Sequence, residues 1–167
     1  MRRWLTALAC DFVISFGACA QAQTTPPPPG LPHTGMLSDG RLFLVSGDRA
    51  VFAVEADGRS RFVSAGPASP SADAKEPGAG LNEGQVSFAL TAGKDGNAIL
   101  VADSRAVKPL RYLARIVAVR DGKTLSAPTS TCPLRPGVSD FEAWPNPLPA
   151  VVIVSIEEAK PDDTACR

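Results

Sequence analysis

The sequence predicts an all-β fold, a two-layer immunoglobulin-like sandwich preceded by a β-meander and a signal peptide. Short apolar runs separated by turn residues such as Asp-Gly support this prediction, and no stretch shows a sustained helical period with capping residues. About seven or eight short strands joined by turns are typical of a sandwich. The cysteine and tryptophan spacing of antibody domains is absent, so the prediction depends on architecture alone.

Residues 1–20 are expected to form the signal peptide. Arg2 and Arg3 precede an apolar stretch, and Ala18-Cys19-Ala20 offers a cleavage pattern of small residues. Asp11 interrupts the apolar stretch, and a carboxylate is unfavourable within lipid. A cleaved signal is therefore expected rather than a retained anchor.

A lipid anchor at Cys19 is the main alternative. The run Phe16-Gly17-Ala18-Cys19 resembles a bacterial lipobox, which would make Cys19 the lipidated first residue. The expected location is the periplasm or the medium, and in the alternative the protein is an outer-membrane lipoprotein. Contact with a membrane is expected only through the signal or through a lipid at Cys19.

The composition bounds the size and the partners of the mature chain. About 147 residues remain after cleavage, which is enough for one domain. The full chain carries 17 basic and 17 acidic side chains, and the basic ones are scattered. This balance provides no long-range field for nucleic acid, so nucleic-acid binding is not expected.

Residues 21–40 are predicted to be a proline-rich spacer, because four consecutive prolines favour an extended polyproline II conformation. The β domain is predicted over residues 41–167, and it includes a mobile loop at 66–84 that lacks any strand or helix period. The domain begins with a predicted meander of three strands, at Arg41–Ser46, Ala50–Ala56 and Ser60–Ser64.

The second half of the domain shows clearer strand patterns. In Gln85–Ala92 apolar and polar residues alternate, which places the apolar set on one face. Pro128 is expected to end the pairing of the short strand before it, because proline cannot donate to a ladder. The last strand is expected to be central, since it is almost continuously apolar. The predicted strands are Gln85–Ala92, Ala98–Ala102, Leu110–Val119, Thr124–Ser126 and Ala150–Ile156.

Cys132 and Cys166 are the two cysteines that remain after removal of the signal, and they are expected to form a disulfide. His33 is the only histidine, and it lies in the spacer, where nothing would hold it against a nucleophile. Asp162 and Asp163 are expected in a solvated polar tail. The sequence therefore predicts no enzyme activity, no metal site and no cofactor.

The stretch from Thr129 to Pro147 is rich in proline, so it is expected to be an ordered loop rather than a strand. One hypothesis is a plug, in which Phe141 and Trp144 cover an open end of the sandwich. The other is a binding patch formed by Arg135, Phe141, Glu142 and Trp144.

Two segments in this part of the chain are Thr129-Ser130-Thr131-Cys132-Pro133 and Phe141-Glu142-Ala143-Trp144-Pro145-Asn146-Pro147. Here the chain resembles small exported bacterial β-rich proteins of uncharacterised function, over about residues 85–156. The resemblance implies a shared fold and no particular activity.

The function expected from these observations is an exported, non-enzymatic binding or assembly module of the bacterial periplasm or envelope. Its expected partner is another envelope protein. The alternative is a structural envelope lipoprotein tethered at Cys19.

Overall fold

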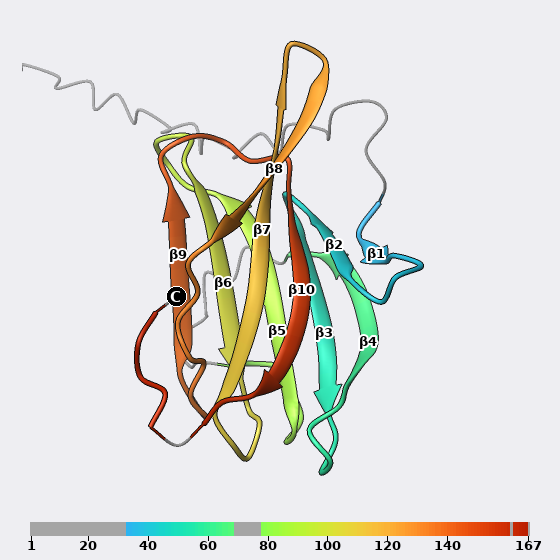
Figure 1. Ribbon diagram of the computed structural model, residues 1–167, viewed down its shortest axis with the longest axis vertical. Helices are drawn as coiled ribbons and strands as arrows, with labels where there is room; N and C mark the ends of the chain where they lie inside the picture. Colours follow the sequence, from blue (N-terminus) through green and yellow to red (C-terminus); the bar gives the residue numbers. More distant parts are fainter. Residues whose placement is uncertain (1–32, 69–77, 161, 167) are drawn as a thin grey trace, which may run out of the picture.

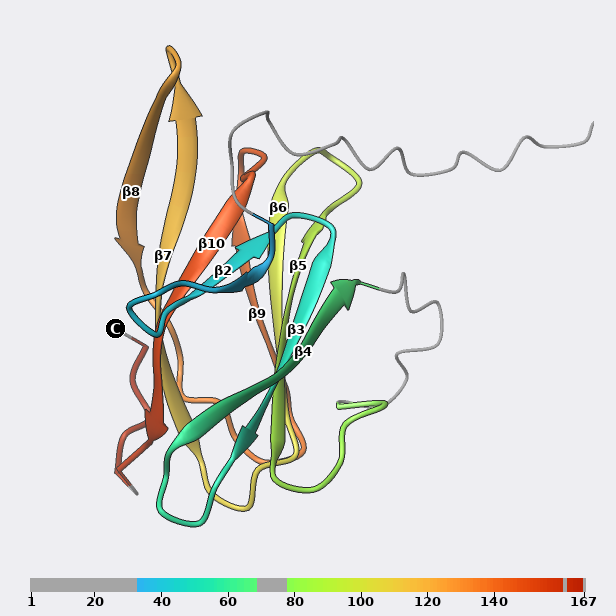
Figure 2. The same cartoon turned by 90° about the vertical axis from the view of Figure 1, so that its right-hand side faces the viewer.

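The computed structural model describes residues 33–68, 78–160 and 162–166, which form two antiparallel sheets packed face to face (Figures 1 and 2). The first sheet has the strand order β1-β2-β10-β7-β8, and the second has the order β4-β3-β5-β6-β9. The strands are β1 (Gly35–Met36), β2 (Leu42–Val45), β3 (Asp48–Val54), β4 (Ser60–Pro67), β5 (Gln85–Ala92), β6 (Ala98–Ser104), β7 (Leu110–Arg120), β8 (Lys123–Thr129), β9 (Ser139–Trp144) and β10 (Ala150–Glu158). The predicted all-β, two-layer sandwich is confirmed.

The main core fills the space between the sheets and contains an aromatic chain that links them. The rings of Phe62, Phe52, Phe88 and Tyr112 follow one another edge to face, with centroid distances of 5.7, 6.2 and 5.0 Å. The first three rings come from the second sheet and Tyr112 from the first. Edge-to-face pairs add to the stability that apolar burial supplies.

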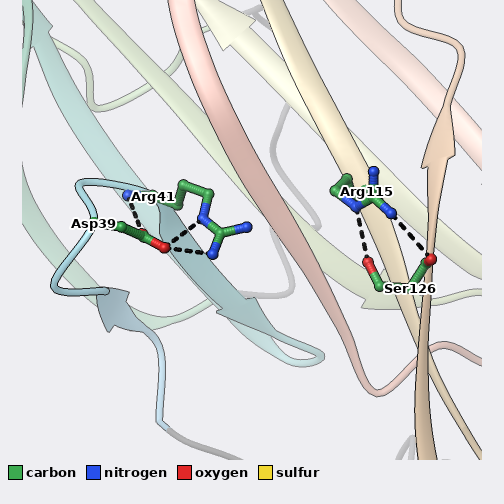
Figure 3. A network of polar contacts seen from close by, with 4 residues as sticks. All are labelled: Asp39, Arg41, Arg115 and Ser126. Carbon is green, nitrogen blue, oxygen red and sulfur yellow. Dashed lines mark hydrogen bonds and ion pairs between the residues drawn. The ribbon is translucent and has the colours of Figure 1, made fainter.

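A second apolar cluster lies on the other face of the first sheet. It contains Phe43, Val45, Val117, Ala150 and Val152, with Leu37 packed against it. These residues alternate with neighbours that belong to the main core, so β2 and β10 are apolar on both faces. The turn before β2 is stabilised by Asp39, which accepts hydrogen bonds from Arg41 (Figure 3).

The predicted meander is wrong in one respect. β3 and β4 form the expected hairpin, but β2 pairs with β1 and β10 in the other sheet. The reason is burial, because all four residues of β2 are buried, which suits a position inside a sheet. The chain therefore crosses between the sheets at Ser46 and Gly47. The expected central position of the last strand is confirmed, since β10 lies between β2 and β7.

Ordered structure also extends into the predicted spacer and loop. Gly35–Met36 forms β1, and the Thr34 hydroxyl accepts a hydrogen bond from the Val45 amide at 2.8 Å. β4 continues through Pro67, and Leu81 is buried, with its carbonyl accepting a hydrogen bond from Arg105 at 3.0 Å. The predicted signal at 1–20, Cys19 and the rest of the spacer before residue 33 lie outside the described residues.

In two places proline residues do not end strand pairing as the sequence predicts. β8 continues through Pro128, which lies opposite Arg115, and the predicted loop contains β9. Both are edge strands, where a proline can be accommodated because one side of the strand makes no ladder hydrogen bonds. The prolines of the predicted loop flank β9 and do not interrupt it. No helix in the described part of the chain is long and apolar enough to span a membrane.

Candidate functional site

The candidate site is centred on β9, whose alternating side chains point either between the sheets or to solvent. Glu142 lies opposite Leu100 and Trp144 opposite Ala98, so both point between the sheets, where Trp144 packs against the main core. Phe141 lies opposite Val101 on the outer face, and 65% of its surface is exposed. β9 therefore turns an acid inward and an aromatic ring outward.

A hydrogen bond from Tyr112 to Glu142 joins the two sheets inside the sandwich. The phenol of Tyr112, on β7, donates to Oε1 of Glu142 at 2.6 Å. Close by, the indole N–H of Trp144 donates to the hydroxyl of Thr129, at the end of β8, at 3.3 Å. These two bonds join the sheets on the side of the sandwich where β8 and β9 are the edge strands.

The carboxyl group of Glu142 is electrostatically unusual. Its pKa is raised to about 7: burial is the largest cause, the hydrogen bond from Tyr112 lowers the pKa, and the charge of the nearby Asp140 raises it. Burial also raises the pKa of the Tyr112 phenol, and the charge of Glu142 adds to the effect. Oε2 of Glu142 is buried without a hydrogen-bond partner in the part of the chain that the structure describes. The site can therefore gain or lose a charge near neutral pH.

Arg135 lies in a different environment from Phe141. It lines a depression of about 260 Å³ that also includes Cys132, Val138, Asp140 and Thr164. The predicted patch is thus divided into the inner pair Glu142 and Trp144, the outer Phe141, and Arg135 beside the disulfide. The plug hypothesis is wrong for Phe141, because the alternation of β9 directs its ring to solvent.

The predicted disulfide between Cys132 and Cys166 is present and holds the C-terminal tail against the domain. The expectation of a solvated tail is wrong for Asp163, whose side chain is only 9% exposed and pairs with Arg111 at 2.6 Å. Arg111 also donates to the carbonyl of Ala165 at 2.8 Å. The disulfide brings the C-terminal tail to β7, where Asp163 forms its ion pair with Arg111.

Sequence reasoning missed Tyr112, Thr129 and Thr131 as parts of this site. The hydroxyl of Thr131 donates to the carbonyl of Tyr112 at 2.5 Å and thereby fixes the chain that leads to Cys132. Asp140, Glu142 and Trp144 occupy alternate positions, and this spacing was the signal that could have identified a strand with these side chains on one face.

The site offers a carboxyl group that can bind a proton near neutral pH and an exposed aromatic ring. Among the residues that the structure describes, no group of three or more His, Cys, Asp or Glu side chains could hold a metal ion. The absence of a cofactor remains a prediction. Comparisons with protein-family models, with curated proteins and with solved structures find no match to this chain.

Proposed function

We propose that the chain is an exported, non-enzymatic binding or assembly module of the bacterial periplasm or envelope, with another envelope protein as its partner. The disulfide supports this proposal, because such bonds persist in oxidising compartments. We also propose that the sandwich works as immunoglobulin-like domains do, as a rigid framework that presents loops and sheet faces. The resemblance to small exported bacterial β-rich proteins belongs to the same proposal.

The observation that carries the proposal is the exposed ring of Phe141. It lies beside Val101 on the outer face of the second sheet, and the neighbouring pair on that face is Ala143 with Ile99. A large aromatic side chain on an apolar sheet face loses much unfavourable hydration when a partner covers it. Aromatic anchors of this kind carry a large share of the binding energy at interfaces.

The sheet edges favour contact through a face rather than through strand addition. On β9 the side chain of Asp140 accepts a hydrogen bond from the Phe141 amide at 3.0 Å, which occupies one donor of the free edge. β8 carries Lys123 and Pro128, and β4 has a bulge between Val51 and Phe52 of its partner strand. Lysine, proline, bulges and inward charges are the features that block edge pairing.

A photo-crosslinking amino acid at position 141 of the full chain tests the binding role. Expressed in a bacterium that exports the protein, it is expected to yield a discrete adduct with one envelope protein. The matched control is the same amino acid at position 63, because Val63 is an exposed apolar residue on the opposite edge strand. Equal adducts at both positions, or none at position 141, would contradict the proposal.

The intact mass of the exported protein tests the compartment and its alternative. A chain that begins at Gln21 or Gln23 without lipid supports the secreted or periplasmic form. A lipid mass on Cys19 supports the tethered lipoprotein instead. A product that keeps residues 1–20 and has reduced Cys132 and Cys166 would contradict export.

A further inference from the structure

The hairpin formed by β7 and β8 extends beyond the rest of the sandwich, as both views show (Figures 1 and 2). Its ten residues from Val119 to Pro128 are all exposed. The turn is Asp121-Gly122, and both residues have positive φ, at 52° and 70°, as the tight turns of hairpins require. At the base, Arg115 donates to the hydroxyl and carbonyl of Ser126 at 3.0 and 3.1 Å, which ties the two strands together (Figure 3).

One face of this projecting hairpin is apolar and has no opposing layer. Tyr112 and Ala114 belong to the main core, and Ile116 packs against it, so Ala118 continues the same face by alternation. Leu125 lies directly opposite Ala118, and it is 51% exposed because the second sheet ends below it. Ile116, Ala118, Leu125 and Ala127 together form what we call the overhang face.

The overhang face ends in two cations that lack close acidic partners among the described residues. Arg120 and Lys123 lie opposite each other next to the turn. Arg120 reaches the neighbouring Asp121 only at 3.9 Å, and Lys123 makes no ion pair within the described residues.

The hairpin of β3 and β4 is different. There Arg59 pairs with Asp57 at 2.6 Å and Arg61 with Glu55 at 3.5 Å. The cations at that turn are therefore neutralised within the chain, whereas those of the overhang face are available to an external carboxylate.

We propose that the overhang face binds an acidic, apolar polypeptide segment of a partner protein. Apolar side chains of the segment would cover Leu125 and Ala118, and carboxylates would pair with Arg120 and Lys123. The order of the residues argues against a membrane, since the cations and Asp121 form the tip and the apolar residues lie behind it. A two-fold contact between antiparallel hairpins of two copies would place these cations over Ile116 and Ala127 of the other copy, neither of which is acidic.

Selection of peptides from a displayed random library by the full exported protein tests this inference. The enriched peptides are expected to combine carboxylates with Leu, Ile or Phe. Their affinity is expected to fall at least about tenfold for Leu125→Ser and for the double variant Arg120→Glu/Lys123→Glu. The matched controls are Val63→Ser and Arg59→Glu/Arg61→Glu on the β3–β4 hairpin, which are expected to bind as the wild type does.

Several results would overturn the inference. These are enrichment of basic or neutral peptides, equal loss in the control hairpin, and binding that does not weaken in high salt. Flotation with vesicles of phosphatidylcholine and phosphatidylglycerol would point to a membrane if it required Leu125. Sedimentation of a dimer that Leu125→Ser dissociates would point to a second copy. The inference rests on the proposed binding role, but the two can fail separately. Peptide binding that requires Leu125 would support the overhang face even if position 141 gives no adduct.

Discussion

Glu142 affects both the fold, as an inward-facing residue of an edge strand, and the chemistry of the site, as its titratable group. An inward-facing carboxyl group on an edge strand discourages pairing with another chain, but it also has to be tolerated beside the core. Tyr112 makes this possible by donating a hydrogen bond at 2.6 Å from the opposite sheet. The pKa of Glu142 is raised because hydrogen bonding compensates only part of the hydration that the carboxyl group loses on burial.

We expect the stability of the protein to depend on the protonation of Glu142. Its pKa rises from 4.5 to about 7 on folding, so the folded state holds the proton more tightly. The contribution of protonated Glu142 to the free energy of unfolding is full below pH 4.5 and is lost as the pH rises toward about 7. Glu142→Gln keeps an acceptor for Tyr112 and should remove this slope, as urea unfolding across the pH range can show. An unchanged slope in Glu142→Gln would assign it to other groups.

Removal of the aromatic ring is expected to destabilise the fold at Trp144 but to have little effect at Phe141. Trp144 packs against the main core, so Trp144→Ala should destabilise the fold by about 3 kcal/mol, at the lower end for a large core residue because it is only partly buried. Phe141 is 65% exposed, so Phe141→Ala should change the free energy of unfolding by no more than about 0.5 kcal/mol. Chemical denaturation measures both, and a large loss in Phe141→Ala would contradict its outward placement.

Among the elements, β8 and β9 show why local sequence signals were incomplete. The alternation in β5 and the turn residues before β6 and β8 identified those strands correctly, because both are local properties. Pro128 and the prolines around β9 suggested interruption, since the rule against proline applies to strands paired on both sides. Whether a strand lies at an edge depends on the strand order of the whole sheet, and short-range sequence patterns carry no information on that order.

The C-terminal tail depends on the disulfide, and removal of that bond tests how much. Cys132 and Cys166 are separated by 34 positions, for which loop closure predicts a stabilisation of about 3–4 kcal/mol. Cys132→Ser/Cys166→Ser should therefore lower the melting temperature by about 10 °C. Hydrogen exchange should rise in residues 162–166 and leave β5 unchanged. A variant that melts like the wild type would show that Arg111 and Asp163 alone hold the tail.

For the whole molecule, the pairing of β2 with β10 had no signal in the sequence. The continuous apolar runs of both strands predicted burial, and both strands are indeed buried on two faces. Nothing local indicates that the short strand β2, near the start of the domain, lies beside the last strand, because that pairing depends on closure of the entire chain. The candidate site has the same origin, since Tyr112 and Glu142 come from different sheets.

This topology leads to a prediction about folding. The first sheet is complete only when β10 has entered between β2 and β7, and the main core contains residues of both sheets. Folding should therefore be one cooperative transition, and refolding should take milliseconds to seconds, as in other all-β domains with distant pairings. Trp144 is the only tryptophan after residue 20, so its fluorescence reports closure of the sandwich while circular dichroism reports strand formation. Coincident kinetics are expected from the two signals, whereas an early strand signal without Trp144 burial would show that strands form before the two sheets close on each other.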